Sequence, residues 1–323
     1  MDLIGNASVR WIEREKEMLN LTVSAEEEIQ KKSELAALLK VEQLPAMPQS
    51  ALIVLQLGND FEKININDLV RPIEADPGLA TQVLKFLNSA FFGIQNSVSN
   101  IKQGIALAGI RIVKNFVLWK AVFSLIPKTD SSIFDVKQLW QDSLRRALFA
   151  RMIVGQLRGD VEIAFVGALL QDMAIPILLK KKPNQYKKLV QTLGKNPDKR
   201  LSELEQEELG WTHADAGEIM CQSWKIPCNL ASLVANHTKI DPYIEEPAKN
   251  LEQLAVSLSA LLPSVVNAKW EEQEKLKHGM DVLFPTSPTM LSDVFVQVDK
   301  EFEHYAVVLQ IPRPKVALID MIS

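Results

Sequence analysis

IEADPGLATQVLKFLNSAFFG, residues 73–93, sets the helical class of this chain. Asp76 precedes Pro77, and an aspartate cap before a proline at the first helical position is a typical helix start. Leu79, Val83 and Leu87 then recur every four residues, which places them on one face of a helix. Polar and small residues close the segment. It therefore predicts an amphipathic helix packed against a core.

The same signals recur along the rest of the sequence. Asn65 and Asn100 stand as caps before apolar-periodic segments, and Gly109 offers a helix exit with positive φ. Periodic apolar stretches predict helices over Trp140–Leu157 and Glu162–Leu179, the second of them buried. Glycine is scarce, with 13 in 323 residues, and no strand-like alternation extends beyond a few positions. We therefore expect an all-α fold.

The charge balance bears on the kind of partner. The formal net charge is −4, and nucleic-acid binding proteins usually carry a basic surplus or a basic face. The densest basic run is Lys180–Lys182 with Lys187 and Lys188, which we interpret as a solvated helix end. These features argue against a nucleic-acid partner.

The cysteines and the N-terminal sequence bear on the compartment. Cys221 and Cys228 match no zinc-binding spacing, and we expect no disulfide between them, which suits a reducing compartment. The first residues lack the apolar core of a signal peptide. No uninterrupted apolar run approaches the ~18 residues of a membrane span. We expect a cytoplasmic protein without a membrane partner.

Polar residues that could form a site gather in the second half of the chain. They stand at the predicted ends of helices, where side chains from neighbouring helices of a bundle can meet and hold a metal ion. Four positions or pairs stand out: Asp142, Gln171-Asp172, His213 and Asn236-His237.

Several motifs together resemble the HDOD family of bacterial signalling modules. They are LPAMPQSALIVLQL (44–57), the segment quoted above, SNIKQGIALAGIRIVKNFVLWKAV (99–122), GALLQDM (167–173), LGWTHADAG (209–217) and SWKIP (223–227). They occur in the family's order between residues 44 and 262. The family is similar in fold to HD-type metal-dependent phosphohydrolases and to HD-GYP phosphodiesterases of cyclic dinucleotides.

The resemblance implies a reduced version of the metal site of those enzymes. Their first His corresponds to Asp142, their His-Asp pair to Gln171-Asp172, and their next His to His213. Their His-His pair corresponds to Asn236-His237 and their last Asp falls near Ser259.

Gln and Asn are poor ligands for zinc-like or iron-like ions, so we expect no metal, no cofactor and no catalytic residue. Any ion that did bind would be held by the set that keeps ligand chemistry, Asp142, Asp172, His213 and His237. The alternative is structural: Asp172 bonds backbone at a helix end, His213 caps a helix, and His237 closes one.

The resemblance also implies a division of the chain. Residues 1–43 form an amphipathic helical lead-in, 44–262 the HDOD domain and 263–323 a helical extension. Within the domain, lobes 44–127 and 134–262 should enclose a cleft that the polar residues partly line, with a boundary at Pro127–Ser132. Apolar stripes in the extensions, with Trp11 and Ile12 in one, could contact a partner or a second copy, or pack on their own domain. The stripe of the C-terminal extension comprises Leu291, Val294, Phe295, Val298 and Phe302.

The function that the resemblance implies is a non-enzymatic regulatory module of bacterial signal transduction. Such a module acts by binding a signalling protein or a small ligand. Two alternatives remain: a residual HD-type phosphohydrolase acting on a nucleotide or cyclic dinucleotide, and a small-ligand sensor that uses the HD-like pocket.

Overall fold

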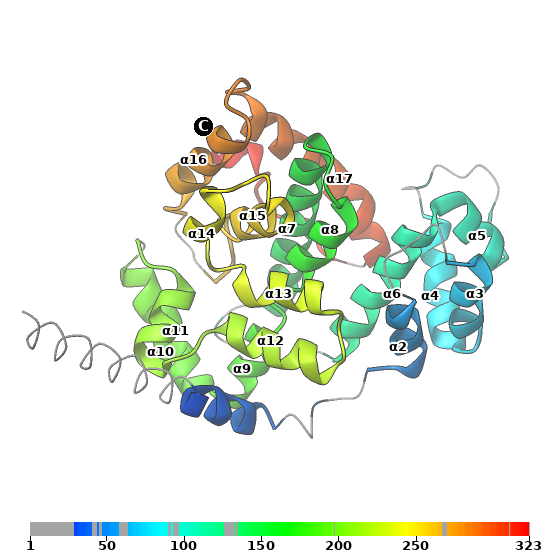
Figure 1. Cartoon of the computed structure of the whole chain (residues 1–323), viewed down its shortest axis with the longest axis horizontal. Coiled ribbons are helices and arrows are strands. Elements are labelled where there is room, and N and C mark those ends of the chain that lie inside the picture. The colour runs from blue at the N-terminus through cyan, green and yellow to red at the C-terminus, as the bar shows by residue number, and fades with distance from the viewer. Residues whose placement is uncertain are drawn as a thin grey trace, which may run out of the picture.

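The fold is all-α, as predicted. In a computed structural model the described residues are 29–40, 44, 47–57, 64–89, 92, 97–125, 133, 135–196, 198–266, 270–309 and 311–322. Within these ranges every regular element is a helix. Figure 1 shows a smaller group of helices beside a larger one.

The smaller, first lobe is built from five helices. They are α2 (Gln49–Gln56), α3 (Ile66–Glu74), α4 (Pro77–Leu87), α5 (Ile101–Ala108) and α6 (Ile110–Leu125). The predicted caps form: the side chains of Asn65, Asp76 and Asn100 each accept a backbone N–H from the first turn of α3, α4 and α5. Gly109 links α5 to α6 with φ 93°, a conformation that favours glycine.

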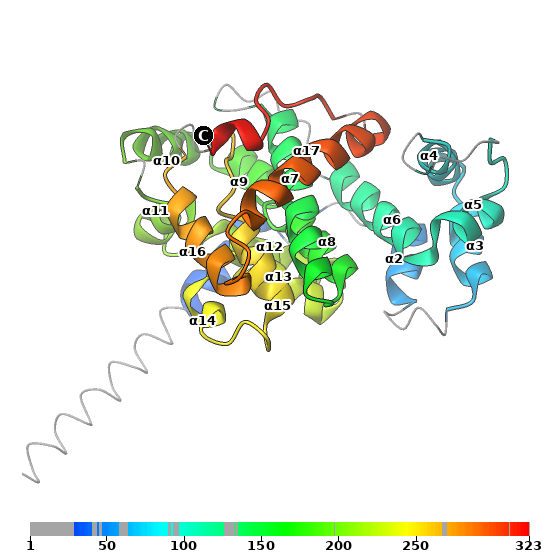
Figure 2. The same ribbon diagram turned by 90° about the horizontal axis from the view of Figure 1, so that it is seen from above.

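The second lobe surrounds the long α7 (Val136–Gln156) and the buried α8 (Val161–Leu170). α13, α15 and α17 pack around this pair, as Figures 1 and 2 show from two sides. The remaining bounds are α9 (Ile175–Lys181), α10 (Pro183–Lys195), α11 (Leu201–Leu209), α12 (His213–Ser223), α13 (Cys228–Asn236), α14 (Asp241–Ile244), α15 (Leu251–Ser259), α16 (Gln273–Leu283), α17 (Met290–Leu309) and a 3-10 turn at Ile319–Met321.

The single buried helix predicted over Glu162–Leu179 is in fact two helices. α8 ends at Leu170 and α9 begins at Ile175, with a turn between them. Pro176 explains the break, because proline has no N–H to donate and its ring clashes with the carbonyl four residues earlier. The stretch Val161–Lys181 has the hydropathy of a membrane span, but 83% of its most apolar window is buried inside the protein. It is a core element of the second lobe.

Both described parts of the extensions pack on the second lobe. In α17, Val294, Phe295, Val298 and Phe302 are buried, and the Phe295 ring lies 6.0 Å from that of Phe149 on α7. Most of the apolar stripe considered for a partner is therefore covered by the chain itself. Residues 29–39 are helical, with Leu35 and Leu39 fully buried. Trp11 and Ile12 lie outside the described residues.

Contacts between α6 and α8 join the two lobes. Across this junction, Nδ2 of Asn115 donates a hydrogen bond to Oε2 of Glu162. The predicted boundary at Pro127–Ser132 lies outside the described residues.

One glycine lets α8 approach α13 closely. A Cβ at Gly167 would lie 2.7 Å from Cδ1 and 3.0 Å from Cβ of Leu233 on α13. Residues that follow the ends of these two helices, Asp172 and His237, can therefore meet.

Gly167→Ala should lower the free energy of unfolding by about 1–3 kcal/mol, because the added methyl overpacks this contact. Gly194→Ala is the matched control: Gly194 lies in α10 with nothing near its Cβ position, so alanine should raise stability by up to about 1 kcal/mol. Urea unfolding of both variants measures the difference, and equal effects would contradict the close approach of α8 and α13.

Candidate functional site

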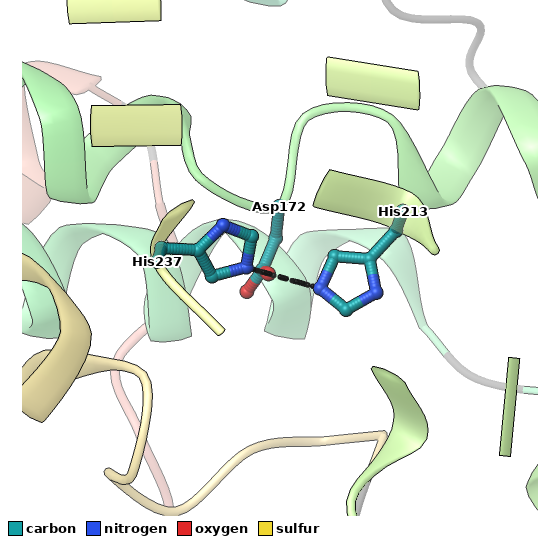
Figure 3. A group of neighbouring side chains, drawn as sticks. All are labelled: Asp172, His213 and His237. Carbon is teal, nitrogen blue, oxygen red and sulfur yellow. Dashed lines mark hydrogen bonds and ion pairs between the residues drawn. The ribbon is translucent and has the colours of Figure 1, made fainter. Parts of the chain in front are cut away.

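Three of the seven predicted site residues meet in the core of the second lobe (Figure 3). Nε2 of His213 lies 3.0 Å from Nε2 of His237. Each of these nitrogens lies 3.5 Å from Oδ1 of Asp172. All three residues are buried.

The ends of three helices bring these side chains together. Asp172 lies in the turn after α8, His213 is the first residue of α12, and His237 is the C-cap of α13. α12 begins where it does because Thr212 and Asp215 form a capping box. The structural alternative gave His213 the role of capping a helix and His237 that of closing one. His237 does close α13, but Thr212, and not the His213 ring, caps α12.

Glu205 on α11 sets the tautomer of His213. Its Oε2 lies 2.6 Å from Nδ1 of His213 and accepts the backbone N–H of the same residue at 2.8 Å. Its Oε1 accepts the hydroxyl of Tyr186 at 2.6 Å. Because a carboxylate accepts, Nδ1 of His213 carries the proton. In the neutral ring, Nε2 then presents a lone pair toward Asp172 and His237.

His237 is held in the same way. Its Nδ1 lies 2.7 Å from the carbonyl oxygen of Val234, which can only accept, so Nδ1 is protonated. Burial, then the nearby His213, lowers the pKa of His237 well below its ordinary value. The neutral His237 therefore also presents an Nε2 lone pair. The two facing nitrogens need a cation between or beside them, either a second proton on one ring or a metal ion.

A built-in cation lies on the other side of Asp172. Nη1 of Arg146, from α7, donates to Oδ2 of Asp172 in a buried ion pair. Asp142 and Glu272 contribute further negative charge around this guanidinium. Arg200 pairs with Glu272, its Nε 2.8 Å from Oε1. The site is thus a network of opposite charges within the protein.

Asp142 lies outside the three-donor group. Its Oδ2 accepts the N–H of Val265 at 2.6 Å, which fixes the loop after α15 to α7. Burial raises the pKa of Asp142 to about 6, against the opposing field of Arg146. The residue corresponding to the first metal ligand of the HD enzymes therefore serves to hold a loop.

The other predicted site residues point elsewhere. Nδ2 of Asn236 bonds the carbonyl of Ser232 at 3.0 Å, and the Ser259 hydroxyl bonds the carbonyl of Val256 at 2.7 Å. The Gln171 amide is fully buried and has no hydrogen-bond partner among the described residues.

A half-open pocket leads to the three residues. Arg146, Asp172, Arg200, His213 and His237 line it, together with apolar groups such as Trp270. It has about 550 Å³ including the part open to solvent, of which about 60 Å³ is clear enough for water. Every lining residue belongs to the second lobe or to the C-terminal extension packed on it. The expectation that the polar residues line a cleft between the lobes is therefore wrong.

The donor geometry fits one metal ion. Asp172, His213 and His237 would hold it, with Glu205 and the Val234 carbonyl orienting the rings as outer partners of metal-bound histidines do. Two histidines and one carboxylate on one side of an ion are a known set for divalent transition metals. Arg146 pairs with the same carboxylate, and its positive charge opposes the binding of such an ion.

Sequence reasoning missed Arg146, Glu205 and Tyr186. Arg146 follows Asp142 by four residues, so both lie on one helix face, and this is the signal that could have revealed it. Glu205 lies in a run of glutamates, LSELEQEEL, where spacing alone does not show which carboxylate is buried.

Asp142→Asn should change the pH dependence of stability. The folded protein binds the Asp142 proton more tightly than the unfolded chain, whose pKa is near 3.8. The stability from this group is therefore full below pH ~4 and is lost as pH rises to about 6. Between pH ~4 and ~7, the free energy of unfolding of the asparagine variant should rise by about 2 kcal/mol relative to that of wild type. Urea unfolding at both pH values tests this, with exposed Asp281→Asn as control; a difference from wild type independent of pH would contradict it.

Comparisons with known proteins agree with the fold. A family model described as the HDOD domain matches residues 44–240. An uncharacterised protein of Treponema pallidum (strain Nichols) is 24% identical over 247 residues, or 74% of this chain. The alignment covers 47% of that relative, so the chain spans about half its length.

Two solved structures share the fold. One is named as a candidate phosphohydrolase from Shewanella amazonensis SB2B, with TM-score 0.62 and 20% identity over 86% of this chain and 98% of its own. The other is named as a candidate signal transduction protein from Marinobacter aquaeolei VT8, with TM-score 0.68 and 18% identity over 88% of this chain and 66% of its own. Since the family model covers more than half of the 323 residues, the chain belongs to the HDOD domain family.

Proposed function

We propose that this chain is a cytoplasmic regulatory module of bacterial signal transduction, which acts by binding a signalling protein or a small ligand and does not hydrolyse phosphate esters. The observation that carries the proposal is the buried ion pair between Arg146 and Asp172. Family membership and the likeness to a structure named for signal transduction support the regulatory part.

The ion pair works against catalysis by a metal-bound hydroxide. Such catalysis needs a ligand cage that lowers the pKa of the bound water. Here three donors converge, and their single carboxylate is already paired with a guanidinium. At roughly 5 Å and an effective dielectric constant of about 20, the guanidinium and a divalent ion would repel each other by roughly 7 kcal/mol. The attraction of the Asp172 carboxylate is then shared between the Arg146 guanidinium and the metal ion.

A second candidate function is a metal-dependent phosphohydrolase. The observation in its favour is the orientation of both histidines, whose Nε2 lone pairs converge with Oδ1 of Asp172. A bound ion would supply Lewis-acid activation of water or phosphate. On this view Asp172, His213 and His237 hold the ion, Glu205 positions His213, and the guanidinium of Arg146 faces the negative charge of a substrate.

A third candidate is a small-ligand sensor that uses the same pocket. The partly exposed Arg200, Ser264 and Trp270 also line it, and a ligand could bind to them without touching the buried donors. The clear space of about 60 Å³ accommodates a few waters, so a nucleotide would need the pocket to widen.

Elemental analysis of the purified protein, with melting curves in the presence and absence of a chelator, separates these candidates. We expect well under one equivalent of transition metal and an unchanged melting temperature. Phosphodiester and phosphomonoester substrates should show no turnover above the His213→Ala background. Stoichiometric metal, a melt that the chelator lowers, and turnover lost in His213→Ala would establish the phosphohydrolase instead.

Arg146→Gln should raise affinity for zinc or manganese at least tenfold, because it removes the cation that competes for Asp172. Tenfold corresponds to about 1.4 kcal/mol, a fraction of the repulsion estimated above. Arg145→Gln is the matched control: Arg145 lies on the same helix but faces Asp299 and the carbonyl of Val316. Isothermal titration measures both variants.

Loss of Arg146 leaves buried carboxylates without their counter-charge and should destabilise the fold by about 3–5 kcal/mol. The double variant Arg146→Gln, Asp142→Asn keeps the net charge of the protein. Its metal affinity can be measured where the single variant does not fold. Equal metal affinity in the Arg146 and Arg145 variants would show that the ion pair does not exclude metal.

A further inference from the structure

A second pocket lies between the lobes, away from the polar site. The first lobe contributes Phe86 from α4 and Asn115, Phe116 and Trp119 from α6. The second contributes Arg151 from α7, Glu162 and Phe165 from α8, and Tyr305 from α17. In Figure 1, α6 extends from the first lobe toward α8. Any ligand in this pocket would contact both lobes at once.

Half of the residues that line it are aromatic. Phe86 and Phe116 stack with centroids 4.2 Å apart and planes 5° from parallel. On the opposite side, the Arg151 guanidinium lies 5.3 Å from the centre of the Phe165 ring and 5.4 Å from that of Tyr305. Such walls favour a flat aromatic ligand, which can bury its faces against them.

Two polar groups in the pocket have unused hydrogen-bonding capacity. Oε2 of Glu162 accepts from Asn115, while its Oε1 accepts no hydrogen bond from the described residues. Nε1 of Trp119 is buried and finds no acceptor among the same residues. Buried donors are normally paired, so Trp119 calls for an acceptor from outside the described chain. The pocket thus offers one acceptor and one donor.

Burial raises the pKa of the Glu162 carboxyl, and the charge of Arg151 and the hydrogen bond from Asn115 oppose that rise. Arg151 neutralises Glu162 only in part, because Arg151 also pairs with Glu301 and donates to the Tyr305 hydroxyl at 2.7 Å. Arg111 and Asp160 add opposite charges nearby. A ligand with an N–H group can therefore donate to Oε1 of Glu162, the oxygen that Asn115 does not use.

We propose that this inter-lobe pocket is a binding site for a flat heteroaromatic ring that carries an amino group, such as an aminopurine. The amino group donates to Glu162, a ring nitrogen accepts from Trp119, and the ring packs on the aromatic walls. The pocket has about 370 Å³ including its open part, which suits a small ligand. Only about 20 Å³ of this is wide enough for a water molecule, so the ring enters by displacing water and turning the side chains that close the pocket. This site does not depend on the metal content or the activity of the polar site.

Fluorescence titration with 2-aminopurine tests the proposal, since the emission of this base is quenched when it stacks on aromatic rings. The full-length protein should quench it saturably. Adenine and purine, which is the same ring without an amino group, should both displace 2-aminopurine. Purine should do so at least tenfold more weakly than adenine. Glu162→Gln, which keeps the bond from Asn115, should weaken 2-aminopurine binding about tenfold or more.

Trp119→Phe keeps a ring and removes the N–H, and it should weaken binding about fivefold. Trp140→Phe is the matched control, because the Trp140 indole N–H is also buried without a partner among the described residues but the residue does not line the pocket; its affinity should equal that of wild type. Circular dichroism and melting curves establish that each variant is folded. Absence of saturable quenching by the wild type would overturn the proposal, as would affinities for Glu162→Gln and Trp119→Phe equal to that of Trp140→Phe.

Discussion

The buried charge of Asp172 is the constraint that organises the second lobe. A carboxylate removed from water costs several kcal/mol unless cations and hydrogen-bond donors replace the solvent. Asp172 gains the guanidinium of Arg146 from α7, while the Nε2 atoms of two imidazoles, from α12 and from the end of α13, lie 3.5 Å from its Oδ1. These groups come from distant parts of the sequence, so their meeting requires the whole helical arrangement. The close approach at Gly167 is one condition for it, since it brings the end of α8 beside the end of α13.

The same carboxylate can be compensated in two ways, and the choice between them decides the chemistry. A metal ion between the two histidines and Asp172 would make a reactive centre, whereas a guanidinium neutralises the charge without an exchangeable ligand position. Arg146 has the second role and is covalently part of the chain. Glu205 and Tyr186 nevertheless keep His213 in the tautomer that a metal would require. The lobe thus combines donor geometry suited to a metal with a charge arrangement that opposes one.

Local signals in the sequence predicted much of the fold, because caps act over three or four residues. Asn65, Asp76 and Asn100 behave as their positions indicated. The break between α8 and α9 was missed because apolar periodicity continues through it, while Pro176 disrupts a backbone bond that periodicity does not record.

The resemblance pointed to Asp172, His213 and His237 but also to Asn236, which is adjacent to His237. Adjacent positions at a helix end point in different directions, so one faces the site and the other Ser232. The spacing from Asp142 places Arg146 on the same helix face, but its burial depends on α8 and α12, which the local sequence does not specify.

α8 also gives the two pockets a physical connection. Glu162 lies in its first turn at the lobe junction, and Asp172 follows its last turn in the polar site. The helix has 10 residues and is about 15 Å long, with its middle fully packed by apolar neighbours. Close-packed interiors transmit displacement rather than absorb it. A change in lobe contact at Glu162 that shifts α8 along its axis would therefore move Asp172 against Arg146 on the neighbouring α7. Because the ion pair between Arg146 and Asp172 is buried, a small change in its geometry changes how well each charge is neutralised by the other. A module that responds to binding between its lobes would have in α8 a direct route to the polar site.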